Sequence, residues 1–388
     1  MLKNGAVIIG GDFQGLGIAR NLAYLNIPAV IVDPDFCIGR YSRYINAYYK
    51  SPLLTDAEAF VAFLIELCEK HNFKHWVIYP TSDQAVYFIS QFKELLSRYY
   101  CIPTPEWEII KYVYNKRETY LLAEMLGIPA PRTFFPNSSH DLEHISLDFP
   151  VILKPAIKEN FFPKTKRKAI IANNTDELLK MYQYMTSLIS NSEVMIQEFI
   201  QGGPSNLYSF CSLFNNGWVK AQLVARRARQ HPMDIGNATT FAVTCDVPEL
   251  EDLAVRLLRK INYQGLSEVE FIYDERDKTF KLLEINPRTW GWHTLGARAG
   301  VNFSTLLFLE LNDRPYTIDS FEKNVKWVRL LTDTALVISE MFKGRLSLKE
   351  YFRSLKGKKE YAVWSLGDPL PFIIEVLLAP YFYFKRGF

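Results

Sequence analysis

The segment 265–288 constrains the fold of this 388-residue chain more than any other stretch. Its two arms, GLSEVEFIYD and TFKLLEINPR, alternate apolar and polar residues, which is the period of a strand with one buried face. A short polar stretch between the arms suits a hairpin turn. The alternation places Glu268 and Glu270 on one face of the first strand, and Glu284 and Asn286 on one face of the second. The segment therefore predicts a β-hairpin that gathers oxygen-bearing side chains.

These side chains have the chemistry of a cation site. Carboxylate and amide oxygens from Glu270, Glu284 and Asn286 suit Mg²⁺ (or Mn²⁺) that bridges nucleotide phosphates. Pro287 ends the strand, so Arg288 would be a fixed cation beside the cluster. The alternative is a solvated polar face on a two-stranded ribbon, and on these residues alone both interpretations stay open.

Length and composition predict two or three domains of a soluble globular protein, with 48% hydrophobic and 22% charged residues. The net charge of +3 gives no indication of nucleic-acid binding. The charge is uneven, because residues 341–388 hold nine Lys or Arg against four Asp or Glu.

Five cysteines are dispersed without C-x-x-C spacing, which favours reduced thiols over a disulfide framework or a zinc site. The chain enters a strand at once, without the features of a signal peptide, and has no apolar run long enough for a spanning helix. We therefore expect a cytoplasmic protein.

Residues 1–105 alternate strand and helix patterns, which predicts a doubly wound parallel sheet. A glycine-rich turn at 10–17 follows the first strand, and Asp33 ends the second. Its spacing does not match G-x-G-x-x-G, so a structural or substrate-facing loop is favoured over NAD binding.

Basic residues recur at strand and loop positions in the central part of the chain. Lys154 ends a short apolar strand, where an unpaired cation is costly unless an anion receives it. Residues 156–168 contain five cations and predict a lid that faces phosphate, or alternatively a solvated basic loop. Arg226, Arg227 and Arg229 at the end of another strand suggest a phosphate clamp.

The C-terminal segment is less regular. Residues 325–344 have a helical pattern, and the end of the chain, from residue 372, is apolar and aromatic before Lys385 and Arg386. Two uses stay open for residues 369–388: a helix packed on the body, or an interfacial anchor on the anionic inner face of a membrane.

The order of these signals resembles the ATP-grasp superfamily from about Ala6 to Phe303, most specifically at Leu282-Leu-Glu-Ile-Asn-Pro-Arg288. Within it, the sequence is most similar to stand-alone carboxylate–amine ligases of the carbamoyl phosphate synthetase large-chain and D-aspartate ligase type. The resemblance implies an α/β fold, α+β in part. A Rossmann-like pre-ATP-grasp domain (1–105) would precede small (106–192) and large (193–315) ATP-grasp subdomains and a helical extension (316–388).

The resemblance also implies roles for individual residues. Arg288 and Lys154 would be catalytic, and Glu270, Glu284 and Asn286 would bind the metal. ATP would be bound by Lys116, Lys154, Gln197, Glu198, Phe199, Ile200, Asn206 and Arg226, with Glu198 or Asn206 as alternatives for the ribose contact. Substrate candidates are Glu268, Asp83, Gly11 and Trp292.

The implied reaction is ATP-dependent joining of a small-molecule carboxylate to an amine through an acyl phosphate, with ATP and Mg²⁺ as cofactors. The acceptor would be an amino acid or a cell-surface precursor, and a dimer is compatible with the family. The alternatives are a bicarbonate-activating enzyme that carboxylates its substrate or forms carbamoyl phosphate, and an ATP-binding regulator without turnover. An NAD-dependent oxidoreductase is a more distant one.

Overall fold

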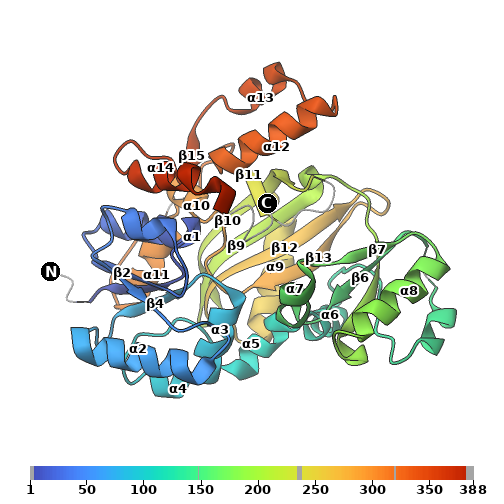
Figure 1. Cartoon of the computed structure of the whole chain (residues 1–388), viewed down its shortest axis with the longest axis horizontal. Coiled ribbons are helices and arrows are strands. Elements are labelled where there is room, and N and C mark those ends of the chain that lie inside the picture. Colours follow the sequence, from blue (N-terminus) through green and yellow to red (C-terminus); the bar gives the residue numbers. More distant parts are fainter. Residues whose placement is uncertain (1–3, 147, 234–237, 319, 382–388) are drawn as a thin grey trace.

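The computed structural model describes residues 4–146, 148–233, 238–318 and 320–381. The N-terminal domain (blue in Figure 1) holds a parallel sheet of order β3-β2-β1-β4. Its elements are β1 (Ala6–Ile9), α1 (Phe13–Ala23), β2 (Ala29–Asp33), β3 (Ala47–Lys50), α2 (Ala57–His71), β4 (Val77–Pro80), α3 (Asp83–Gln91) and α4 (Lys93–Leu96). All residues of β1, β2 and β4 are buried, because helices cover both faces of the sheet.

The second unit is a small antiparallel sheet of order β5-β8-β6-β7. It comprises β5 (Thr133–Phe134), β6 (Val151–Pro155), α7 (Lys158–Thr165), β7 (Ile170–Ala172), α8 (Thr175–Thr186) and β8 (Val194–Glu198). Helices α5 (Trp107–Tyr114) and α6 (Lys116–Met125) connect it to the N-terminal domain. Part of the predicted basic lid thus forms helix α7.

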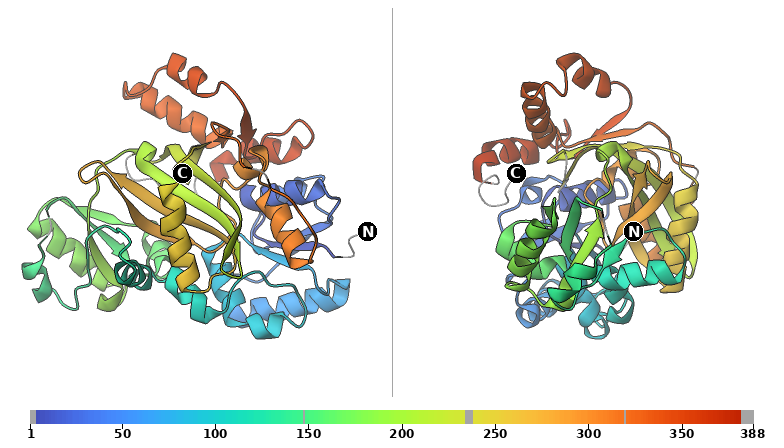
Figure 2. Two further views of the ribbon diagram at one scale, coloured as in Figure 1. Left: turned by 180° about the vertical axis from the view of Figure 1, so that it is seen from behind. Right: turned by 90° about the vertical axis from the view of Figure 1, so that its right-hand side faces the viewer.

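The third unit is a seven-stranded sheet of order β13-β12-β9-β10-β11-β14-β15. Its main elements are β9 (Leu207–Asn215), β10 (Trp218–His231), β11 (Ala238–Thr244), α9 (Glu249–Lys260), β12 (Gly265–Asp274), β13 (Thr279–Asn286), α10 (Thr294–Arg298) and α11 (Phe303–Leu311). Figure 2 shows α9 across the rear face of this sheet. Leu253 and Leu257 of α9 share a core with Val269, so the neighbouring residues of β12 face the other way, toward the site.

The C-terminal extension contains helices α12 (Leu330–Phe342), α13 (Leu348–Ser354) and α14 (Leu370–Leu377). It is not wholly helical, because β14 (Lys326–Val328) and β15 (Lys359–Tyr361) extend the large sheet. The helix expected from residue 325 therefore starts only after β14, where Trp327 and Val328 are buried. Among the described residues, no helix is long and apolar enough to cross a membrane. Residues 382–388 of the predicted anchor lie outside the described part of the chain.

Asp368 fastens the extension to the N-terminal domain. Its buried carboxylate accepts hydrogen bonds from Arg20 Nε (3.0 Å), Ser42 Oγ (2.6 Å) and the Arg43 amide (3.0 Å). Arg20 also donates to the Val363 and Asp368 carbonyls. One carboxylate therefore satisfies donors from two segments of the N-terminal domain.

We predict that Asp368→Ala lowers the free energy of unfolding by about 3 kcal/mol, because it removes the buried carboxylate that pairs with the partly buried Arg20 guanidinium and accepts from Ser42 and the Arg43 amide. Chemical denaturation followed by circular dichroism measures this loss. The control is Asp148→Ala, whose side chain is 99% exposed and whose loss should leave the melting temperature unchanged. Equal stability of the Asp368 variant and the wild type would contradict the assigned role.

Candidate active site

The β12–β13 hairpin forms the floor of the site. Glu268 pairs with Asn286, and Glu270 lies directly opposite Glu284, in the antiparallel register. A β-bulge follows Glu270, so the alternation is kept on the part of the hairpin that carries the polar side chains. The predicted hairpin and its polar face are confirmed.

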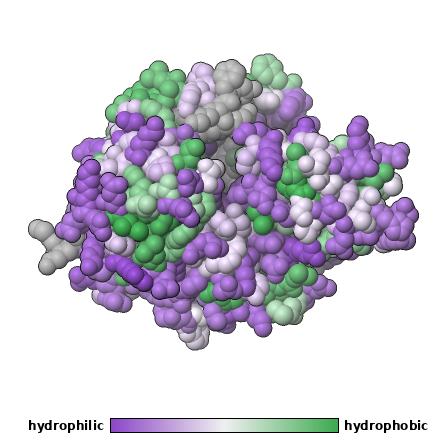
Figure 3. All heavy atoms as spheres, turned by 60° about the horizontal axis from the view of Figure 1, so that its bottom comes forward, coloured by the Kyte–Doolittle hydropathy of each residue, from purple (hydrophilic) through white to green (hydrophobic). Residues whose placement is uncertain are grey.

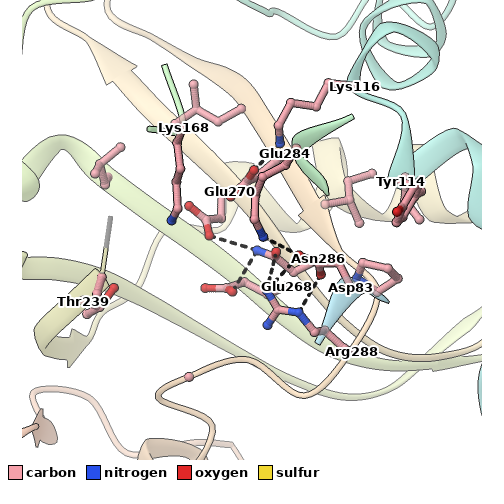
Figure 4. Close-up of a pocket in the computed structure, with 18 of the residues that line it drawn as sticks. Asp83, Tyr114, Lys116, Lys168, Thr239, Glu268, Glu270, Glu284, Asn286 and Arg288 are labelled. Carbon is pink, nitrogen blue, oxygen red and sulfur yellow. Dashed lines mark hydrogen bonds and ion pairs between the residues drawn. The ribbon is translucent and has the colours of Figure 1, made fainter. Parts of the chain in front are cut away.

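Hydrogen bonds connect the floor residues to one another (Figure 4). Asn286 Nδ2 donates to Glu268 Oε2 (3.1 Å) and Glu270 Oε1 (2.9 Å). Arg288 Nη2 donates to Asn286 Oδ1 (3.2 Å), so the strand end and the cation after it are one connected group.

Two carboxylates of the floor form ion pairs with basic side chains from other elements. Lys116, the first residue of α6, pairs with Glu284, and Arg227 of β10 pairs with Glu270. Burial alone would raise the pKa of Glu284, but the Lys116 ammonium outweighs it and holds that pKa well below its usual range. Each of these two carboxylates is therefore paired with a cation.

Lys154 and Lys168 lie on the side of the small sheet. Lys154 Nζ donates to Gln197 Oε1 (2.9 Å), and Figure 4 shows Lys168 on the opposite side of the carboxylates from Lys116. Burial lowers the pKa of each lysine to about 8, with neighbouring cations contributing. Both lysines are thus placed where an added negative charge would stabilise their protonated form.

The pKa of Glu268 is shifted in the opposite direction to that of Glu284. Burial, followed by the neighbouring Glu270 carboxylate, raises its pKa to about 8. Ser209 Oγ donates to its Oε1 (3.0 Å). Burial beside a second carboxylate therefore favours the protonated form of this group more than at an ordinary glutamate.

The N-terminal domain reaches the site through Asp83, the first residue of α3. Asp83 accepts hydrogen bonds from Arg288 Nε (2.6 Å) and from Lys158 Nζ of α7 (2.9 Å). These two cations outweigh the effect of burial and lower the pKa of Asp83. One carboxylate therefore connects all three units.

Aromatic side chains wall the cavity at this end. Phe13, Trp292 and Trp327 line it together with Asp83 and Arg288. Phe13 and Trp327 have ring centroids 6.2 Å apart. The predicted candidate Trp292 thus lies in the cavity, next to the charged residues.

A smaller adjoining cavity lies between the small sheet and the large sheet. Its lining includes Gln197, Glu198, Phe199 and Ile200, together with the apolar residues Ile152, Leu207, Ile272 and Leu283. Lys154 lines both cavities, which makes them one elongated site. The Glu198 carboxylate is occupied by Lys281, Arg276 and the Arg132 amide.

Three predicted site residues lie elsewhere. Asn206 donates to the Tyr273 carbonyl outside both cavities. The Gly11 amide donates to Asp33 (2.6 Å) within its own domain, where a Cβ would meet Cys37. Arg226 is exposed on β10 and does not line the cavity.

Among the three arginines of the predicted clamp, only Arg227 lines the main cavity, since Arg229 pairs with Asp333. Arg226 and Arg227 are neighbours on the strand, so their side chains point to opposite faces. The sequence therefore indicated a basic strand end but not which of the two arginines faces the cavity. Lys158 and Lys168, within the predicted basic lid, also line the cavity.

The floor suits a hard divalent cation. Among the described residues, no group of three His, Cys, Asp or Glu side chains is already converged as a metal site. The predicted set contains only two such residues, because its third member is Asn286, and Glu284 and Glu270 are each paired with a cation. Oxygen donors held on neighbouring strands and neutralised by positive charge fit Mg²⁺.

The comparisons with known proteins give the site its context. Residues 227–302 match the family described as the carbamoyl-phosphate synthase L chain, ATP binding domain. A D-aspartate ligase from Enterococcus faecium is 24% identical over 297 residues, covering 73% of this chain and 70% of that protein.

Solved structures resemble most of the fold. An L-amino acid ligase from Bacillus licheniformis has a TM-score of 0.61 at 16% identity, covering 80% of this chain and 74% of that one. An N5-carboxyaminoimidazole synthetase from Staphylococcus aureus has a TM-score of 0.65 at 17% identity, covering 88% and 86%. The chain has the ATP-grasp fold, and the resemblance to the ATP-grasp superfamily that its motifs predicted is confirmed.

Proposed function

We propose that this protein is an ATP-dependent carboxylate–amine ligase. The observation that carries the proposal is the pairing of Glu284 with Lys116 and of Glu270 with Arg227 at the centre of the cavity. The carboxylates would serve as ligands for Mg²⁺ and the cations as partners for a triphosphate, so Mg²⁺ and ATP together would satisfy all four groups. The similarity to D-aspartate ligase and L-amino acid ligase supports formation of a carbon–nitrogen bond.

ATP would extend through both cavities. The adenine suits the apolar walls of the smaller cavity, where backbone groups of residues 197–200 are available as partners. Lys154 at the junction, with Lys116, Lys168 and Arg227 beyond it, would bind the phosphates. Glu270, Glu284 and Asn286 would hold Mg²⁺, which supplies neutralisation of the phosphate charge when bound.

The reaction needs positioning and charge neutralisation rather than a protein nucleophile. A carboxylate oxygen of the substrate attacks the γ-phosphorus, ADP leaves, and the amine then displaces phosphate from the acyl phosphate while losing a proton. Arg288 lies beside the floor and would hold the transferred phosphoryl group. Helix α7, which carries Lys158, would help exclude water from the intermediate.

The N-terminal end of the cavity suits an α-amino acid. Asp83 lies between the cations Lys158 and Arg288, so both signs of charge are presented within one hydrogen-bonded group. A zwitterion carries the complementary charges, with its ammonium toward Asp83 and its carboxylate toward a cation. The aromatic wall formed by Phe13, Trp292 and Trp327 suits the side chain. Glu268 would remain a hydrogen-bonding acid behind the metal ligands.

The reaction is identified by ADP release screened over pairs of carboxylates and amino acids, with bicarbonate as a separate arm. Amine-dependent release supports the proposal, and bicarbonate-dependent release without amine supports a carboxylase instead. For an active pair, a carboxylate labelled with ¹⁸O should transfer label to phosphate. Unlabelled phosphate would contradict the acyl phosphate.

We predict that Glu284→Gln lowers Mg²⁺-dependent ADP release by at least about 100-fold, because it removes a metal ligand while keeping the side-chain size. The matched control is Glu275→Gln at the exposed turn of the same hairpin, which should retain wild-type turnover. Melting temperatures verify that both variants fold. Wild-type turnover by the Glu284 variant would refute the assignment.

Asp83→Asn should raise KM for the amino acid by about tenfold or more, because a charge-assisted contact to its ammonium is lost. KM for ATP should change little. Glu106→Gln serves as the control, since Glu106 also pairs with a lysine, Lys93 (2.9 Å), but does not line the cavity. A parallel rise in both KM values would contradict a role in acceptor recognition.

ATP affinity should fall as the pH rises through 8. In the free protein the pKa values of Lys154 and Lys168 are about 8, and phosphate binding favours the protonated lysines. Calorimetric titration of a non-hydrolysable ATP analogue between pH 6.5 and 9.5 measures the trend. Glu268 titrates in the same range, so the contribution of Lys154 is the difference between wild type and Lys154→Met. Identical pH slopes would contradict that contribution.

A further inference from the structure

The C-terminal extension exposes large apolar side chains on two consecutive helices. Ile338 and Phe342 of α12 are 50% and 88% exposed, and Leu348 and Phe352 of α13 are 57% and 62% exposed. Residues four apart lie on the same face of a helix, so each helix presents an apolar pair to solvent. We call these four residues the apolar pairs.

The two helices are held firmly while these side chains remain outside. Asp333 of α12 accepts two hydrogen bonds from Arg229 (2.8 and 2.7 Å) and one from Thr240 Oγ1 (2.9 Å). Arg229 also donates to Ser354 Oγ of α13 (2.9 Å), so one buried arginine ties both helices to the large sheet. Figure 1 shows α12 and α13 projecting from the upper edge of the molecule.

The same segment is strongly basic. Residues 338–359 contain seven Lys or Arg and two Asp or Glu, a net charge of +5 against +3 for the whole chain, so the remainder carries −2. Of the two acids, Glu340 is buried and pairs with Lys343 (2.7 Å), and Glu350 caps α13 through Ser347. Figure 3, in which the bottom of the molecule is turned toward the viewer, shows groups of apolar side chains scattered among hydrophilic ones.

The positive charge and the protruding apolar side chains of this surface favour one kind of partner over the others. A second copy of the chain would bring two clusters of +5 together across a symmetric contact, which is unfavourable. A protein partner would need pockets of matching shape to receive these four protruding side chains. A fluid anionic bilayer needs no pocket, because it accepts protruding apolar side chains between charged headgroups.

We propose that the α12–α13 surface binds anionic membranes peripherally, with the apolar pairs entering the headgroup region and the surrounding lysines and arginines contacting lipid phosphates. This contact is separate from the catalytic cavity. It would place the enzyme on the membrane without requiring any part of it to span the bilayer.

The test is sedimentation of the full chain with phosphatidylcholine–phosphatidylglycerol vesicles and with pure phosphatidylcholine vesicles. Wild type should bind the anionic vesicles, lose binding at high salt, and bind the neutral ones at least about tenfold more weakly. Phe342→Ser combined with Phe352→Ser should lower anionic binding about tenfold. Both side chains are exposed, so melting temperature and ADP release should stay unchanged.

The matched control is Leu370→Ser combined with Leu377→Ser on α14, whose side chains are 46% and 68% exposed. It should bind like the wild type. No binding by the wild type, equal binding of neutral vesicles, or loss only in the α14 variant would overturn the proposal. Binding to immobilised polyglutamate without binding to vesicles would indicate an acidic protein partner and would also overturn it.

Discussion

Two ion pairs, Lys116 with Glu284 and Arg227 with Glu270, govern how this site can work. Each pair joins a carboxylate suited to a metal ion with a cation suited to phosphate. Buried charges of one sign would be costly, and the pairs remove that cost while no ligand is present. In the proposed function, Glu270 and Glu284 would hold Mg²⁺ while Lys116 and Arg227 would bind the triphosphate, so the charges of the four residues would stay balanced with the ligands bound.

The fold brings the four residues of these ion pairs together from separate elements. The hairpin β12–β13 supplies the acids, β10 supplies Arg227, and the first turn of α6 supplies Lys116. Helix α9 covers the opposite face of the large sheet, which leaves the acidic face to the cavity. Asp83 of the N-terminal domain accepts hydrogen bonds from Arg288 and Lys158. A ligand that contacts Asp83 would therefore also lie next to Arg288, beside the floor of the site.

Much of this arrangement was predictable from the sequence, because strand alternation determines which side chains share a face. Glu268, Glu270, Glu284 and Asn286 were grouped correctly on that basis. The choice between Arg226 and Arg227 depends on which face of β10 meets the cavity, and this is set by pairing with β9 and β11 rather than by local pattern. Short strands such as β14 and β15 are likewise defined by their neighbours, so the extension was predicted as helical alone.

The most direct test of the ion-pair exchange is calorimetric titration of a non-hydrolysable ATP analogue with Mg²⁺ and, separately, with a chelator. Without Mg²⁺, Glu270 and Glu284 should retain Arg227 and Lys116, and the triphosphate would have to break both pairs while leaving two carboxylates uncompensated. The account predicts that binding weakens by about 100-fold or more when Mg²⁺ is removed. Equal affinity with and without Mg²⁺ would contradict it.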